Sequence, residues 1–168
     1  AVSRRGQLYT LNTESARLTR VGDAAPLALQ GSRFGVDFNP AADRVRVVSD
    51  QGQNLRLHPD TGAVAATDPA LAYAPDDVAA GRSPQVSAAG YTYNPDNDKL
   101  TTNYAIDLRA GTLVLQGSRE GQTPVISPNT GQLRTVGSLG LGTLEDASFD
   151  ISDVRNTPLA ALRVNGQT

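Results

Sequence analysis

Short apolar strands that end in turn residues recur along this chain, and this repetition constrains the fold more than any other feature of the sequence. Each copy alternates apolar and polar residues, turns at Asn, Asp, Thr or Gly, and continues into a second short strand. The first strands and turns lie at Leu8–Thr13, Leu55–Gly62 and Tyr104–Gly111, the second strands at 18–21, 63–66 and 112–115, and a fourth turn at 128–133. Because these turn residues supply the backbone angles of tight turns, each copy predicts a β-hairpin.

A second kind of hairpin alternates with the first. Its copies lie at Phe34–Pro40 with 44–48, at Tyr91–Pro95 with 100–102, and at Ser148–Ser152 with 159–164. Joining the two kinds gives four short strands between residues 34 and 67, which is the content of one propeller blade. No segment has a convincing helical period. We therefore expect an all-β fold, a β-propeller-like array of four-stranded antiparallel blades.

The hairpins group into blade-like sets within a single domain, residues 1–168. Complete sets are expected at about 34–67 and 88–116, partial sets at 7–22, 124–137 and 147–164, and a long loop at 69–87. One hairpin is already under way at Gln7, and another is due to begin at Thr168. We therefore expect the array to be incomplete at both ends, within a longer chain or a larger complex that covers its edges.

Charge and residue content exclude several function classes. The net charge is −2 and no basic run exceeds Arg4–Arg5, so nucleic acid is not an expected partner. The chain contains no cysteine, which removes disulfides, zinc–thiolate sites and thiol nucleophiles. No run of about eighteen apolar residues occurs, so no transmembrane segment is predicted.

His58 is the only histidine and a candidate metal ligand. The alternation of Leu55 and Leu57 places His58 on the polar face of its strand, where Asp60 and Asp37 are candidate partners. A copper site of the superoxide-dismutating kind usually draws on several imidazoles, and this chain offers one. The alternative is a structural role for His58 at the end of its strand.

Two other groups of residues are candidates for calcium binding or for glycoside hydrolysis. Asp96, Asn97 and Asp98 have the oxygen density of a calcium loop, but the glycine and distant glutamate of an EF-hand are absent, and a plain hairpin turn is the alternative. Glycoside hydrolysis requires two carboxylates about 5–10 Å apart. The only glutamates are Glu14, Glu120 and Glu145, and nothing in their spacing requires that they meet.

The stretches 35–49 and 53–62 carry a family resemblance. Their pattern, Gly-Val-Asp-Phe-Asn-Pro followed by Asn-Leu-Arg-Leu-His-Pro-Asp-Thr-Gly, resembles a bacterial family of exported, propeller-like domains of unknown function. The resemblance extends over nearly the whole chain, and family members usually carry a further hairpin set before Gly6 and another hairpin after Thr168. It implies an exported protein of the cell envelope, periplasmic or surface-associated, and it implies no catalytic residues.

Repeated hairpins with few reactive side chains favour a non-catalytic binding or scaffolding module. Repeat folds place equivalent turns on one rim, and loops carry binding. We expect an envelope protein or polysaccharide to be contacted by the loops that contain Asn39, Asp43, Asn94 and Tyr73. The alternatives are an exported metal-dependent enzyme that uses copper or calcium, and a glycoside hydrolase.

Overall fold

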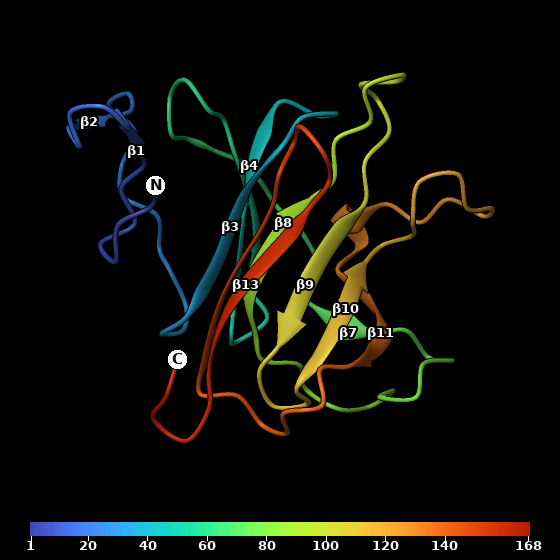
Figure 1. Ribbon diagram of the computed structural model, residues 1–168. Coiled ribbons are helices and arrows are strands. Elements are labelled where there is room, and N and C mark those ends of the chain that lie inside the picture. Colours follow the sequence, from blue (N-terminus) through green and yellow to red (C-terminus); the bar gives the residue numbers. More distant parts are fainter.

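The computed structural model describes all residues, 1–168, and confirms an all-β protein (Figure 1). Its thirteen strands are accompanied by one short 3-10 turn, η1 (Pro128–Thr130). The strands are β1 (Tyr9–Leu11), β2 (Leu18–Arg20), β3 (Phe34–Asn39), β4 (Arg44–Ser49), β5 (Asn54–Leu57), β6 (Val64–Thr67), β7 (Ala72–Tyr73), β8 (Val86–Tyr91), β9 (Asn103–Asp107), β10 (Thr112–Gln116), β11 (Gln132–Ser138), β12 (Asp146–Ile151) and β13 (Pro158–Arg163).

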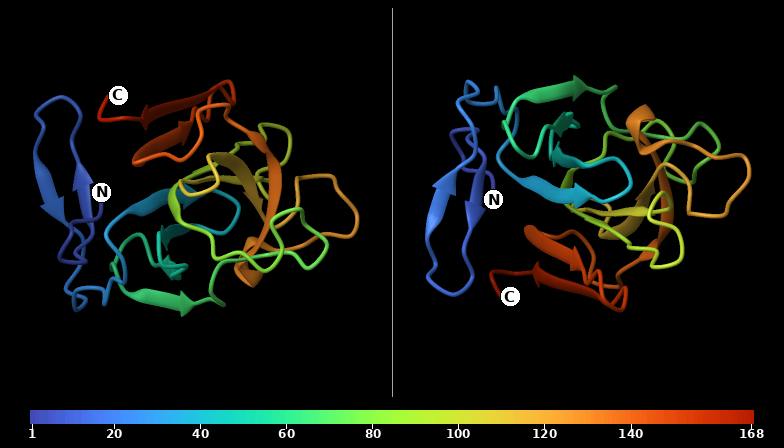
Figure 2. Two further views of the ribbon diagram at one scale, coloured as in Figure 1. Left: turned by 90° about the horizontal axis from the view of Figure 1, so that it is seen from below. Right: turned by 90° about the horizontal axis from the view of Figure 1, so that it is seen from above.

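The strands form four separate sheets. β1–β2 and β12–β13 are two-stranded, whereas β3-β4-β5-β6 has four strands and β7-β11-β10-β9-β8 has five. All neighbours are antiparallel except β7, which runs parallel to β11. The sheets do not close into a barrel or a ring (Figure 2), so the propeller arrangement remains a prediction.

Most of the expected hairpins are present, but hairpins of one kind do not always occupy the same position within their sheets. Strand pairs β3–β4 and β12–β13 are the hairpins of the second kind expected at 34–48 and 148–164. At the third place the paired strands are β8 and β9, and residues 92–95 and 100–102, expected as strands, lie in the connection between them. Counted from the central strand β3, the hairpin at 55–66 joins the third and fourth strands of its sheet. Counted from the central strand β8, the hairpin at 104–115 joins the second and third. Similar local turns therefore serve different positions in the two large sheets.

The segment expected as a separate set at 124–137 belongs instead to the sheet formed by residues 88–116. Its turn residues form η1, and Gly131, with φ of 72°, ends that turn and leads into β11. β11 then pairs with β10, and also with β7 from the expected long loop at 69–87. The turn residues at 128–133 therefore predict a tight hairpin wrongly, because β10 reaches β11 through a long connection and β7 lies far earlier in the chain.

Residues 1–23 repeat residues 47–69, as the hairpins expected at 8–21 and 55–66 indicated. Gly6 and Gly52 have φ of 76° and 79°, and each donates its N–H to the carbonyl of the serine three residues earlier. Leu11 pairs with Leu18 as Leu57 pairs with Val64. The N-terminal hairpin therefore corresponds to the outer strands β5 and β6.

One edge strand from each of three sheets, β3, β8 and β12, lies in the middle of the molecule, where the three strands pack against one another (Figure 2). Two glycines permit this approach. A Cβ atom on Gly35 would lie 2.7 Å from the backbone of Ala88 and Ala89, and one on Gly90 would lie 3.0 Å from the Phe149 ring. Small residues thus set the spacing of the sheets whose ends form the candidate site.

Candidate functional site

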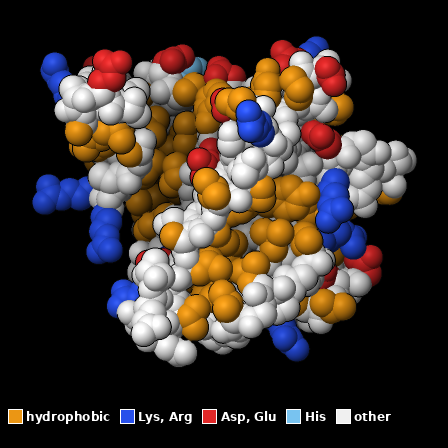
Figure 3. Space-filling view, in the orientation of Figure 1, with side chains coloured by type: hydrophobic (Ala, Val, Ile, Leu, Met, Phe, Trp, Pro, Cys, Tyr) orange, Lys and Arg blue, Asp and Glu red, His pale blue; other side chains and the backbone are white.

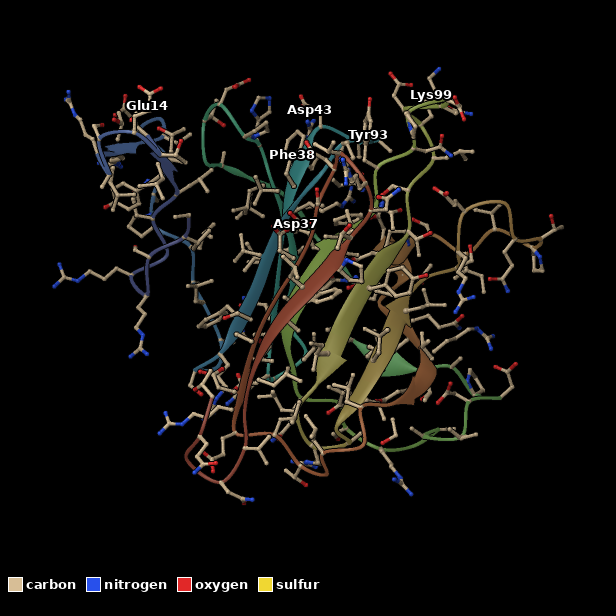
Figure 4. All side chains as sticks on the ribbon, in the orientation of Figure 1. Glu14, Asp37, Phe38, Asp43, Tyr93 and Lys99 are labelled. Atoms are coloured by element: carbon tan, nitrogen blue, oxygen red, sulfur yellow. The ribbon has the colours of Figure 1, made fainter.

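A cleft of about 430 Å³ lies where β3, β8 and β12 end. These three strands lead to loops at the same end of the molecule, where Figure 4 shows Asp43, Tyr93 and Lys99 beyond Asp37. Residues from all three strands and their loops line the cleft, including Asp37, Phe38, Tyr91, Tyr93, Asp150 and Asp153. The cleft is thus built by residues far apart in sequence.

Asp37 and Asp150 hold equivalent positions in their hairpins. Asp37 lies opposite Arg46 across β3–β4, and Asp150 lies opposite Leu159 across β12–β13. The backbone N–H of Tyr91 donates to Asp37 Oδ2 at 2.6 Å, and the N–H of Phe38 donates to Asp37 Oδ1 at 2.7 Å. Both oxygens of Asp37 are therefore fixed as hydrogen-bond acceptors.

The pKa of Asp37 is raised to about 6, because burial and, to a smaller extent, the negative charge of Asp150 outweigh the two backbone amides, which lower it. No cationic side chain forms an ion pair with Asp37, Asp150 or Asp153. The cleft therefore holds negative charge that no residue of this chain neutralises.

Replacing Asp37 with asparagine is expected to reduce the pH dependence of stability. Because the folded-state pKa of Asp37 lies above its unfolded value, its contribution is fully present below about pH 4 and is lost as the pH rises through about 6. Between pH 5 and pH 8 the wild type should lose on the order of 1–2 kcal/mol through this group. Urea unfolding of the wild type and the variant at pH 5 and pH 8 measures the free energy of unfolding of each. Equal pH dependence of the two proteins would contradict the raised pKa of Asp37.

One wall of the cleft is held by a buried arginine. Arg46, only 1% exposed, donates through Nε to the Tyr91 hydroxyl and through its other nitrogens to the side chains of Asn54, Asn129 and Asp68. Asp68 in turn accepts two hydrogen bonds from Arg56, at 2.8 and 2.9 Å. The position of Tyr91 is thus fixed by a network that joins both large sheets.

The opposite wall is fixed by Asn156 in the loop after β12. Its Oδ1 accepts the N–H of Tyr93 at 2.8 Å, and its Nδ2 donates to the Tyr93 carbonyl at 2.7 Å. Asn156 has φ of 50°, a conformation that asparagine tolerates better than most residues. The loop therefore pairs with the chain after β8 as a strand would.

The loop residues expected to bind a partner separate into two groups. Asp43 is exposed at the β3–β4 turn, at the same end as the cleft (Figure 4). Asn39 is buried and accepts the N–H of Ala41, and Asn94 accepts the N–H groups of Asp96 and Asn97. Asn39 and Asn94 therefore shape the turns, while Asp43 is exposed and pairs with the neighbouring Arg44 at 3.9 Å.

Tyr73 differs from its expected role as a binding residue of a loop. It lies in β7 and is buried in the main hydrophobic cluster, where its hydroxyl donates to Asp107 Oδ2 at 2.6 Å. Burial raises the pKa of this hydroxyl, and the Asp107 carboxylate adds to the effect. The pairing of β7 with β11 carries Tyr73 into the core, which the loop-like sequence around it did not indicate.

The candidate metal ligands are not gathered into a site. His58 Nδ1 accepts the backbone N–H of Asp60 at 3.2 Å and lies 3.9 Å from the Asp60 carboxylate, while Asp37 belongs to the cleft and contacts neither. No group of three or more His, Asp or Glu side chains could hold a metal ion. The ligand set proposed for copper is therefore not assembled by these residues.

The calcium and glycosidase candidates likewise do not converge. Asn97 accepts the N–H of Lys99, and with the bonds to Asn94 this closes a plain turn around Asp96 and Asp98. Of the three glutamates, Glu145 pairs with Arg163 at 3.3 Å, and none lines the cleft. Sequence patterning did not indicate that Asp150 and Asp37 line one cleft. The available signal was their equivalent position in two hairpins of the second kind.

Comparison with known proteins identifies the family to which the chain belongs. No curated protein and no solved structure matches the chain. The structure contains no helix with the length and apolar character needed to cross a membrane. One family model, described as Domain of unknown function (DUF4394), matches residues 1–168. This match over the full length shows that the chain belongs to the DUF4394 family.

Proposed function

We propose that this protein is a non-catalytic binding module that contacts a polypeptide partner through the loops at one end, with a basic side chain of the partner entering the cleft. The observation that carries the proposal is the position of the cleft, at the ends of three central strands and beside the β3–β4 turn and the loops after β8 and β12. Loops that a rigid scaffold holds together are the usual place for recognition.

The chemistry of the cleft favours a cation. Asp37, Asp150 and Asp153 supply carboxylates without cationic partners, and an arginine or lysine would form charge-assisted hydrogen bonds with them. Tyr91 and Tyr93 line the same cleft, and aromatic rings attract cations. Backbone amides donate to both oxygens of Asp37. The Asp37 carboxylate is therefore better suited to accept hydrogen bonds at a fixed position than to donate a proton.

We further propose that the sheets are blades of a propeller-like array in an exported protein of the bacterial cell envelope. The packing of the edge strands β3, β8 and β12 in the middle of the molecule and the repeat of 47–69 by 1–23 support the array. The resemblance of 35–49 and 53–62 to exported bacterial domains supports the location. Loops at one rim of such an array would face a common partner.

The proposal is tested with a short basic probe. Titrating ¹⁵N-labelled protein at pH 7.5 with the peptide acetyl-Arg-Gly-Arg-amide should shift the amide signals of Phe38, Tyr91 and Tyr93. In the double variant Asp37→Asn with Asp150→Asn the affinity should fall at least tenfold, because each lost charge-assisted contact is worth about 1.5–3 kcal/mol. The variant Asp98→Asn removes an acidic residue outside the cleft and should bind as the wild type does.

Two results would contradict the proposal. The first is an absence of shifts at the cleft, and the second is equal binding by the double variant and the wild type. A neutral oligosaccharide, such as maltotetraose, serves as the comparison probe. Shifts caused by the sugar but not by the peptide would replace the polypeptide partner with a polysaccharide.

A further inference from the structure

A second groove, of about 260 Å³, lies at the same end of the molecule as the cleft. The β3–β4 turn and the connections from β8 to β9 and from β10 to β11 form its walls. Phe38 lines the cleft, and the next residue, Asn39, lines the groove. The β8–β9 connection is divided in the same way, with Tyr93 in the cleft and Lys99 in the groove (Figure 4). The cleft and the groove therefore adjoin at two shared loops.

The groove and the cleft differ in charge. Lys99 and Arg119 line the groove, and neither side chain forms an ion pair. Glu120 also lines it, with its backbone N–H donating to Thr102 Oγ1 at 3.0 Å, so the groove holds two cations and one carboxylate. The cleft, by contrast, is lined by three carboxylates and no cation. An acidic group of a partner is therefore attracted to the groove and a basic group to the cleft.

Exposed apolar side chains lie among the charges of the groove. Leu100 and Val125 both line it and are 38% and 82% exposed. Figure 3 shows loops of this end at the upper right, where hydrophobic, acidic and basic side chains lie next to one another. Covering exposed apolar surface favours binding. The groove therefore suits a ligand that carries an apolar group next to an acidic one.

Hydrogen bonds hold the groove in a fixed position relative to the cleft. Two of them, at 2.9 and 3.0 Å, join Ser118 to Ile126 in the wall formed by the β10–β11 connection. Asn129 also lines the groove and accepts a hydrogen bond from Arg46, which donates in turn to the Tyr91 hydroxyl of the cleft. One buried network thus connects the two hollows. A ligand that occupies both meets a preorganised surface, which lowers the ordering cost of binding.

We propose that the groove binds the same polypeptide partner as the cleft, with an aspartate or glutamate of the partner at Lys99 and Arg119 and an apolar side chain against Leu100. This step rests on the proposed function above. A polypeptide carries basic, acidic and apolar side chains on one chain, about 3.3–3.6 Å apart per extended residue. Linking two contacts in one ligand makes the second contact intramolecular and strengthens binding. The partner segment thus combines a basic residue with a nearby pair of one acidic and one apolar residue.

A series of peptides tests the groove. The peptides are acetyl-Arg-Gly-Glu-Leu-amide with the glycine repeated one to four times, the same set in reverse order, and a counterpart of each with Gln in place of Glu. At pH 7.5 at least one glutamate peptide should bind about fivefold tighter than its counterpart, because it adds ion pairs at a partly exposed site. In ¹⁵N titrations this peptide should shift the amide signals of Lys99 and Arg119 together with those of Phe38 and Tyr91.

A variant of the groove separates its contribution from that of the cleft. Lys99→Gln with Arg119→Gln should bind glutamate and glutamine peptides equally, and should bind acetyl-Arg-Gly-Arg-amide as the wild type does. Both side chains are exposed and without ion pairs, so the wild-type stability should be kept. The matched control is Arg82→Gln with Arg109→Gln, which removes two arginines without ion pairs from a different hollow. The control should keep the preference for glutamate.

Three results would overturn the inference. They are equal binding of the glutamate and glutamine peptides at every spacing and in both orders, an unchanged preference in the groove variant, and a loss of preference in the control. In each case the peptide acetyl-Arg-Gly-Arg-amide reports on the cleft separately, so binding of a basic residue there would stand. Shifts at the groove without shifts at the cleft would contradict the proposed function, and with it the occupation of both hollows by one partner.

Discussion

The variant Asp68→Ala is expected to lose about 3–5 kcal/mol of unfolding free energy, because it leaves a buried guanidinium without a carboxylate. Arg46 and Asp68 side chains are 1% and 6% exposed, and Arg46 Nη1 lies 3.2 Å from Asp68 Oδ2. The same carboxylate binds Arg56 through two hydrogen bonds. Asn54, Asn129 and Tyr91 offer Arg46 only neutral acceptors, so Asp68 is the charge that balances it.

Urea unfolding followed by far-UV circular dichroism measures this loss. The matched control is Asp76→Ala, since Asp76 also pairs with an arginine, Arg134, at 3.0 Å, but on the surface, where such pairs contribute little. The double variant Arg46→Met with Asp68→Ala should be more stable than Asp68→Ala alone, because it removes the uncompensated charge. If Asp68→Ala and Asp76→Ala have equal stability, Asp68 does not hold the network together.

Local patterning predicted the hairpins well because a hairpin is decided by a few neighbouring residues. The turn at Asn39–Asp43 and the turn at Pro59–Gly62 lie where the sequence indicated, and the strands on either side pair as expected. The same reasoning misplaced residues 124–137, since the partners of β11 are β10 and β7 and neither is joined to it by a tight turn. Turn residues specify a change of direction, but the partner strand depends on packing between distant segments.

The candidate site was less predictable than the fold for the same physical reason. Arg46 meets Asn129, 83 residues away, and Asp37 meets Tyr91, 54 residues away. Alternation places Asp37 and Arg46 on one face of their sheet, but it does not say which sheet packs on that face. The sequence therefore suggests Asp37 as a partner of His58 in a metal site, whereas the packing of β3 on β8 places it in the cleft.

The close approach of β3 and β8 leads to the second large expected effect. Gly35→Ala should destabilise the protein by about 1–3 kcal/mol, because the added methyl group meets backbone atoms and forces the two strands apart. The new Cβ would lie 2.7 Å from Ala88 C and Ala89 N and 2.9 Å from Val48 Cγ2. A backbone atom cannot rotate away as the end of a flexible side chain can. The clash is therefore relieved only if the two sheets move apart, which loses packing contacts between them.

The Asp37 hydrogen bond reports this separation directly. Asp37 lies two residues beyond Gly35 on the same face of β3, so moving β3 lengthens its 2.6 Å contact with the Tyr91 N–H. In Gly35→Ala the Tyr91 amide should exchange with deuterium faster. Gly137→Ala is the matched control, because nothing lies within 4 Å of its Cβ and its φ is not positive. Equal stability of the two variants, or an unchanged Tyr91 amide, would show that the spacing of the central strands does not depend on Gly35.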